Sequence, residues 1–261
     1  MAAREKQEKH KDGSRTLFIS DLHLDSKTPA ITATLLDFLD RETPDCRALY
    51  ILGDLFEAWV GDDDESELSA TVATALRKVA DAGTPVYLMH GNRDFLIGED
   101  FARRCGAKLL PDPTVINCHG QKVALAHGDA LCTRDRAYME FRAQVRDPQW
   151  QQHFLSKSLM ERYMIAQQVR EQSQESNSYK ASDIMDVTPS EVVKLLESLK
   201  VKTLIHGHTH RPAVHTITLE KPIQRSRSAT RIVLGDWHQR GWVLEFTDEG
   251  YDLRNFPLVE A

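Results

Sequence analysis

The chain has 261 residues, which is enough for one large domain or for one domain with a sizeable insertion. Hydrophobic residues make up 41% and charged residues 28%, as in a soluble globular protein, so disorder is expected only at the ends. The formal net charge of −6 argues against broad affinity for nucleic acid, which requires a basic surface.

The start of the chain and its cysteines set further limits. Residues 1–15 are hydrophilic and lack the apolar core of a signal peptide, so we expect a disordered extension. No run of about eighteen apolar residues occurs, so we expect no membrane-spanning segment. The cysteines have no Cys-x-x-Cys spacing and are expected to be reduced thiols, which favours a cytosolic protein and leaves peripheral membrane contact open. They are Cys46, Cys105, Cys118 and Cys132.

Strand-like and helix-like segments alternate through the first half of the chain, which is typical of an α/β layer structure. Apolar, β-rich runs predict strands over 16–20, 48–52, 86–89, 123–126 and, further on, 203–205. Amphipathic spacing predicts helices over 29–41 and 65–82. Short strands predicted over 213–219, 229–234 and 241–246 indicate a second, antiparallel sheet.

A segment of different character separates these regions. Residues 137–186 have no convincing strand, and their apolar residues recur at helical spacing. We interpret them as a helical cap inserted into a core formed by residues 16–136 and 187–261. Its larger apolar side chains either line a groove for acyl chains or pack the cap onto the core. They are Phe141, Trp150, Phe154, Leu159, Met160, Tyr163, Met164 and Ile165.

Five of the predicted strands end in short polar motifs. They are Asp21-Leu22-His23, Gly53-Asp54, Gly91-Asn92-Arg93-Asp94, His127-Gly128-Asp129 and Gly207-His208-Thr209-His210. Open α/β sheets place their ligand sites at the carboxyl ends of strands, so these side chains are expected to converge. Carboxylates, imidazoles and an amide without cysteine suit two divalent cations better than a structural zinc ion.

The spacing within the motifs indicates individual roles. Asp21 and His23 have the same parity and can hold one cation together, while Asp54 is the natural bridge between two cations. Asn92 offers a neutral oxygen, and Arg93 offers a planar positive charge for phosphate oxygens. His127, His208 and His210 complete the set, although parity alone does not exclude His206.

Each motif is weak when taken alone. Asp-x-His occurs by chance, Gly-Asp after a strand is usually a turn, and a lone histidine is more often structural than a ligand. His90 and His119, each followed by glycine, belong to that structural class. The order of all five motifs, each after an apolar run, makes chance a poor explanation.

Together these motifs resemble the calcineurin-like metallophosphoesterase superfamily over about residues 16–212. The resemblance implies a four-layer αββα sandwich, an α/β (α+β) fold of two mixed sheets, here with a helical cap. It implies that the first metal is held by Asp21, His23, Asp54 and His210. It implies that the second is held by Asp54, Asn92, His127 and His208, and it leaves His206 in a supporting position.

A narrower resemblance rests on residues 56–63 and 205–212, and it extends over about residues 16–257. The chain is similar to the UDP-2,3-diacylglucosamine diphosphatase branch of lipid A biosynthesis. This implies hydrolysis of the pyrophosphate of UDP-2,3-diacylglucosamine to UMP and 2,3-diacylglucosamine 1-phosphate (lipid X), with Mn²⁺ as the metal. It also implies a monomer on the cytoplasmic face of the inner membrane. Water would attack the α-phosphorus, with Arg93, Asp54 and His208 as catalytic residues.

The same resemblance implies a set of substrate contacts besides Asn92, Arg93 and His208. By position they are Asp135, Ser173, Asn177 and Lys180. The last three share one helix face, whose alternative interpretation is simple solvation. Arg170, Phe154 and Tyr138 are further candidates.

Two charged groups have structural alternatives to a ligand role. The run 62–65 can bind metal, but we expect it to complement the N-terminus of the helix predicted to start at residue 65. A second group is expected to form a solvated strand edge, with anionic lipid as the alternative. It contains Arg225, Arg227 and Arg231.

Two other functions remain open from the sequence. A soluble dinuclear phosphoesterase could act on nucleotides, nucleic acid or phosphoproteins, although a large apolar cap argues against it. A non-catalytic scaffold with the same fold is disfavoured because the complete ligand set is present. Oxygen and imidazole ligands also accept manganese, iron, cobalt or zinc, so the ligand types do not select the metal.

Overall fold

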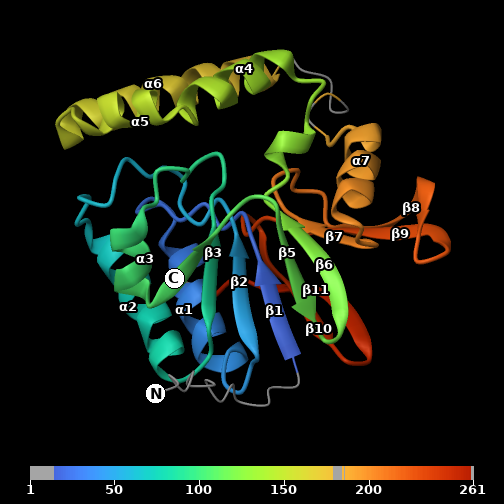
Figure 1. The fold of residues 1–261 in the computed structure, drawn as a ribbon. Coiled ribbons are helices and arrows are strands. Elements are labelled where there is room, and N and C mark those ends of the chain that lie inside the picture. Colours follow the sequence, from blue (N-terminus) through green and yellow to red (C-terminus); the bar gives the residue numbers. More distant parts are fainter. Residues whose placement is uncertain (1–14, 179–183, 185, 260–261) are drawn as a thin grey trace, which may run out of the picture.

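The computed structural model describes residues 15–178, 184 and 186–259, and within 172–178 it describes the backbone alone. Two sheets form the centre of the molecule (Figure 1). The first has the order β11-β10-β1-β2-β3-β4, with β1 (Arg15–Ile19), β2 (Ala48–Leu52), β3 (Val86–Met89), β4 (Ala107–Leu110), β10 (Arg240–Thr247) and β11 (Gly250–Pro257). The second has the order β5-β6-β7-β9-β8, with β5 (Thr114–Cys118), β6 (Gln121–Ala126), β7 (Thr203–His206), β8 (Ala213–Ile223) and β9 (Ser226–Val233).

Both sheets are mixed. Strands β1 to β4 pair in parallel, and β10 and β11 extend that sheet as an antiparallel hairpin. In the second sheet β6, β7 and β9 are parallel, while β5 and β8 are antiparallel edge strands. The predicted fold class of two mixed sheets is therefore confirmed.

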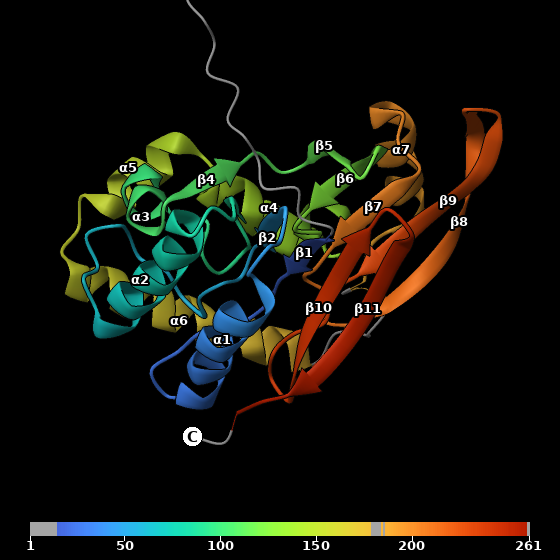
Figure 2. The same cartoon turned by 90° about the horizontal axis from the view of Figure 1, so that it is seen from below.

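Helices cover the outer face of each sheet, as the two views show (Figures 1 and 2). The helices α1 (Pro29–Glu42), α2 (Glu67–Asp81) and α3 (Glu99–Cys105) cover the first sheet, and α7 (Pro189–Leu199) covers the second. Alternate residues of β1 explain the layering. Leu17 and Ile19 enter the cluster beneath the helices, whereas Phe18 packs between the sheets with Leu125 of β6.

The C-terminal strands differ in part from the prediction of one second sheet. Strands β8 and β9 join β7, but β10 pairs with β1 and completes the first sheet. An alternating pattern shows which side chains face a core but not which sheet the strand joins. The same limit explains why β4, β5 and β11 were not predicted. Their half-exposed side chains give no strong pattern.

Two predicted boundaries also move. The disordered extension was expected to include residue 15, but Arg15 is the first residue of β1. Residues 1–14 lie outside the described residues. Helix α2 begins at Glu67 instead of residue 65, because the Ser66 side chain caps it by accepting the Ser69 N–H. Of the acidic run, Asp64 supports this start by accepting the Ser66 N–H at 3.1 Å and, through its carbonyl, the Ser69 hydroxyl at 2.9 Å. Asp62 serves a different helix, since it accepts the backbone N–H groups of Gly98 and Phe101 at the start of α3.

The predicted helical segment contains α4 (Arg136–Val145), α5 (Pro148–Leu155) and α6 (Leu159–Ser178), after the short 3-10 turn η1 (Asp129–Leu131). These helices lie across the end of the sheets at which β1, β2 and β3 finish (Figure 1). Trp150, Phe154, Leu159 and Ile165 pack onto the first core cluster, whereas Met160 is 70% exposed. The packing interpretation thus holds for these four residues, and a groove for acyl chains stays a prediction for the exposed ones. Among the described residues, no helix is long and apolar enough to cross a membrane.

Candidate metal centre

The polar motifs converge at the ends of strands from both sheets. Asp21 follows β1, Asp54 follows β2, and Asn92 follows β3, all in the first sheet. His127 follows β6 and the 208–210 pair follows β7, in the second. Two groups of donor atoms form there, each with all atoms within 4.8 Å of one another. They are Asp21, His23 and His210, and Asp54, His127 and His208.

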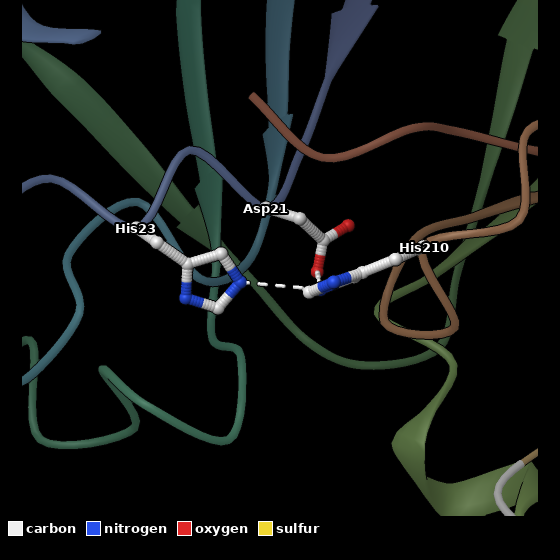
Figure 3. A group of neighbouring side chains, drawn as sticks. All are labelled: Asp21, His23 and His210. Carbon is white, nitrogen blue, oxygen red and sulfur yellow. Dashed lines mark hydrogen bonds and ion pairs between the residues drawn. The ribbon is translucent and has the colours of Figure 1, made fainter. Parts of the chain in front are cut away.

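The first group brings three donor atoms to one point (Figure 3). The Nε2 atoms of His23 and His210 lie 3.2 Å apart, and His210 Nε2 lies 3.4 Å from Asp21 Oδ1. Imidazole nitrogens and carboxylate oxygens at this spacing compete for protons unless a cation binds them. Their chemistry fits a divalent ion of the first transition row.

The second group includes the predicted amide. Oδ1 of Asn92 lies 3.0 Å from His127 Nε2 and 2.8 Å from His208 Nδ1. The other ring nitrogen of His127 donates to Leu52 O at 2.9 Å, which leaves Nε2 directed at the donor group. This group also fits a divalent cation.

Asp54 lies between the two groups. Its Oδ2 atom is 3.8 Å from His23 Nε2 in the first group and 3.8 Å from His127 Nε2 in the second. The residue is only 2% exposed. This is the position required of a carboxylate that bridges two ions.

The ligand backbones are strained. Asp21, His23, Asp54, His208 and His210 all have φ between 51° and 68°, the left-handed region that non-glycine residues seldom adopt. Backbone hydrogen bonds hold the turns, from Asp21 N to Gly53 O and from His23 N to Asp54 O. Five such residues at one place indicate a functional constraint.

Glycines make the close approach possible. A Cβ atom on Gly91 would overlap the Asp54 carboxylate, and one on Gly207 would overlap the carboxylate of Asp21. The motifs need glycine here because two ligand-bearing turns come too close for any side chain.

Two buried aspartates, to which the sequence assigned no role, support the site. Asp94 accepts the backbone N–H groups of Gly91, at 2.7 Å, and Leu55, also at 2.7 Å, and so ties two ligand turns together. Asp129 accepts the Tyr138 hydroxyl at 2.6 Å and Arg142 Nε at 2.8 Å, which anchors α4 beside His127. Each is the last residue of one of the five motifs, two positions after a ligand, and that adjacency was the available signal.

Burial and charge together shift the pKa values of the site. Burial raises the pKa of Asp54, whereas Asp21, despite burial, is held below its usual range by His210. Burial opposes protonation of His23 and His127, but nearby carboxylates outweigh it and raise both pKa values to about 9. Burial and the charge of His127 lower the pKa of His208 to about 3. The carboxylates thus draw positive charge into the centre, here as protons on His23 and His127.

The three histidines that the sequence analysis set apart as structural or supporting lie outside both groups. His90 Nε2 lies 2.6 Å from Ile97 O, and His119 Nδ1 lies 2.9 Å from Asp248. His206 donates from Nδ1 to Gly207 O at 2.8 Å. All three have the structural placements expected of them.

The predicted substrate residues have mixed placements. Asp135 caps α4 by accepting the Tyr138 N–H at 3.1 Å, and the Tyr138 ring lies 5.9 Å from the His208 ring. Phe154 is buried and its ring stacks on that of Trp150, with ring centroids 5.1 Å apart. Ser173 and Asn177 lie on the α6 backbone, whereas Lys180 lies outside the described residues.

The arginines singled out by the sequence lie in different surroundings. Arg170 lies 2.9 Å from Glu57 and 3.7 Å from Asp25. Arg225 and Arg227 are exposed near the β8–β9 turn, as expected. Arg231 does not form a solvated edge: it is 9% exposed, 3.6 Å from Asp186, on β9 between β7 and β8.

A family model supplies the deciding observation. The calcineurin-like phosphoesterase model matches residues 14–212, most of the chain and all five motifs. The chain belongs to the calcineurin-like phosphoesterases. As a member of this family it is a metal-dependent hydrolase, and its two donor groups are where divalent ions fit.

Curated relatives match almost the whole chain. A UDP-2,3-diacylglucosamine hydrolase of Cellvibrio japonicus is 52% identical over 93% of this chain and 99% of its own. One of Marinobacter nauticus is 52% identical over 94% of this chain and 99% of its own. One of Pseudomonas aeruginosa is 50% identical over 93% of this chain and 99% of its own.

Proposed function

We propose that this phosphoesterase hydrolyses the pyrophosphate of UDP-2,3-diacylglucosamine and releases UMP and 2,3-diacylglucosamine 1-phosphate. The observation that carries the proposal is identity of 50% or more with hydrolases named for this substrate, over nearly the full length of both chains. The helical cap over the metal centre supports a substrate with an apolar part, because each buried methylene contributes about 0.8 kcal/mol.

The side chains then have distinct tasks. Asp21, His23, Asp54 and His210 would hold one ion, and Asp54, Asn92, His127 and His208 the other. When bound, divalent ions would lower the pKa of a water molecule and neutralise charge on the phosphate oxygens. Arg93, 25% exposed beside the centre, offers a fixed charge to the phosphoryl group. The leaving group is a sugar phosphate with a second pKa of about 6. It is therefore stable as a dianion at neutral pH and departs without a general acid.

Mn²⁺ is our proposal for the metal on the basis of the family resemblance, and the carboxylate, amide and imidazole ligands accept it as they accept iron, cobalt or zinc. The test measures Mn²⁺-dependent UMP release from UDP-2,3-diacylglucosamine and from its unacylated analogue. We expect activity on the acylated substrate, loss in Asp54→Asn, and no loss in the control Asp252→Asn, an exposed position on β11. Equal activity on both substrates would retain the metal centre and refute the lipid assignment.

We also propose that the cap contacts the cytoplasmic face of a membrane. Leu155, Met160 and Met164 are 41%, 70% and 65% exposed on α5 and α6, with Lys157 between them in the sequence. Exposed apolar residues beside a cation suit an anionic lipid surface. The fraction of protein that sediments with phosphatidylglycerol vesicles should be smaller for the double variant Met160→Gln/Met164→Gln than for the wild type. An unchanged fraction would refute this contact.

A further inference from the structure

Glu57 contacts three side chains of separate origin at the edge of the metal centre. Its Oε2 atom lies 2.7 Å from His23 Nδ1, and its Oε1 atom lies 2.9 Å from Arg170 Nη2 on α6. Arg93 Nη1 lies 3.9 Å from the same Oε1. The carboxylate is 13% exposed, so both oxygens are largely withdrawn from water.

The two nitrogens of His23 face different partners. Nε2 faces His210 and Asp54 within the donor groups, whereas Nδ1 faces Glu57. An imidazole that binds a cation through Nε2 must carry its proton on Nδ1, and a carboxylate beside Nδ1 favours that tautomer. The ring N–H of His23 is not aligned on Glu57 as a hydrogen bond, but at 2.7 Å the carboxylate charge can set the tautomer of His23 and restrict the orientation of its ring.

The backbone holds Glu57 in register with His23. The Glu57 N–H donates to Leu24 O at 3.1 Å, and Leu24 pairs with Phe56 in a short parallel bridge. The two loops that carry the contact are thus fixed side by side, and the 2.7 Å approach does not depend on a free loop.

On its other side, Glu57 is held by the cap. Arg170 lies on α6, and its guanidinium contacts Glu57 and, at 3.7 Å, Asp25. We propose that Glu57 is a positioning residue that orients His23 for the first ion, and that Arg170 fixes Glu57 from the cap. The proposal rests on the two-ion centre proposed above, and it makes the docking of α6 and the affinity for the first ion interdependent.

A simpler role would be that Glu57 and Arg170 only fasten α6 to the core. Metal affinity separates the two roles, because loss of a fastening contact would not weaken an ion held by other residues. Asp25→Asn is a matched control, since Asp25 contacts Arg170 as well.

The experiment titrates Mn²⁺ into metal-free full-length chains and follows free Mn²⁺ by electron paramagnetic resonance. In Glu57→Gln, which keeps the side-chain size, we expect two ions per chain but a dissociation constant of one ion raised about 10- to 100-fold. Arg170→Met should raise the same constant by a few-fold, and should add nothing in the double variant. Asp25→Asn should bind both ions as the wild type does.

The outcomes discriminate. Wild-type affinities in Glu57→Gln would overturn the positioning role. A raised KM with unchanged metal affinity in Arg170→Met would overturn the link to the cap and assign Arg170 to substrate. Fewer than two ions in the wild type would refute the proposed two-ion centre and not the role of Glu57 specifically.

Discussion

Arg93 can be removed without dismantling the metal centre. Its backbone N–H donates to Asp54 Oδ1 at 2.8 Å, and this bond survives truncation of the side chain. We therefore expect Arg93→Ala to lower kcat by about 10²- to 10³-fold, the cost of one donor to a transition state, with two ions still bound. Arg93→Lys keeps the charge without the planar fork and should recover part of the loss. Rate measurements with elemental analysis check this, and a parallel loss of metal would assign Arg93 a structural role.

His206 gives a pH prediction of defined sign. It is fully buried, and burial lowers its pKa to about 4. The unfolded chain takes up this proton below about pH 6.5 and the folded chain does not, so the histidine reduces folding stability as the pH falls from 6.5 towards 4. His206→Gln cannot take up that proton. Relative to wild type, the metal-free variant should gain on the order of 2 kcal/mol between pH 7.5 and pH 5 in urea unfolding. A pH-independent difference would contradict this.

At the scale of elements, α6 is fastened to the loop between β2 and α2 by a buried arginine. Arg162 is 2% exposed, donates to Val60 O at 2.6 Å, and forms an ion pair with Asp63. The neighbouring Tyr163 hydroxyl donates to Asp64. The acidic run thus serves the helical cap through Asp63 and Asp64, α3 through Asp62, and the start of α2 through Asp64.

Loss of Arg162 should therefore loosen the cap and spare the core. In Arg162→Met we expect the docking of α6 to weaken by about 2–3 kcal/mol, the usual cost of lost hydrogen bonds to a charged group. Limited proteolysis should then cleave within the cap at a higher rate, while two Mn²⁺ ions per chain still bind at saturating Mn²⁺. Arg136→Met, an exposed arginine in the first turn of α4, is the control. Equal protease resistance of both variants would show that Arg162 does not hold the cap.

For the whole molecule, the features that could be predicted from the sequence are those set by residues close together in the chain. The ligand-bearing strand ends follow from an apolar run ending in a polar motif, and both signals lie within about ten residues. Pairing of Arg162 with Asp63, 99 residues away, has no such signal. The placement of β10 beside β1 and the burial of Arg231 are of the same kind. Long-range partners are set by packing of the complete fold, which no local pattern contains.

The metal centre joins the two sheets, so metal removal should destabilise the entire molecule. Asp21, Asp54 and Asn92 follow strands of the first sheet, and His127 and His208 follow strands of the second. An ion present at 100 times its dissociation constant stabilises the folded state by about 2.7 kcal/mol. Chelation should therefore lower the Tm in calorimetry, and the decrease should shrink in Asp54→Asn.

The size of this Tm shift should also depend on pH. In the metal-free protein the pKa values of His23 and His127 are raised to about 9. At pH 7 each ring therefore carries protons on both nitrogens, and an ion must displace one of them. Metal affinity, and with it the Tm difference between loaded and chelated protein, should rise from pH 6.5 to pH 8.5 at fixed Mn²⁺. Titration calorimetry in two buffers of different ionisation enthalpy should detect the released protons. A Tm difference that falls as the pH rises would mean that these imidazoles do not bind the ions.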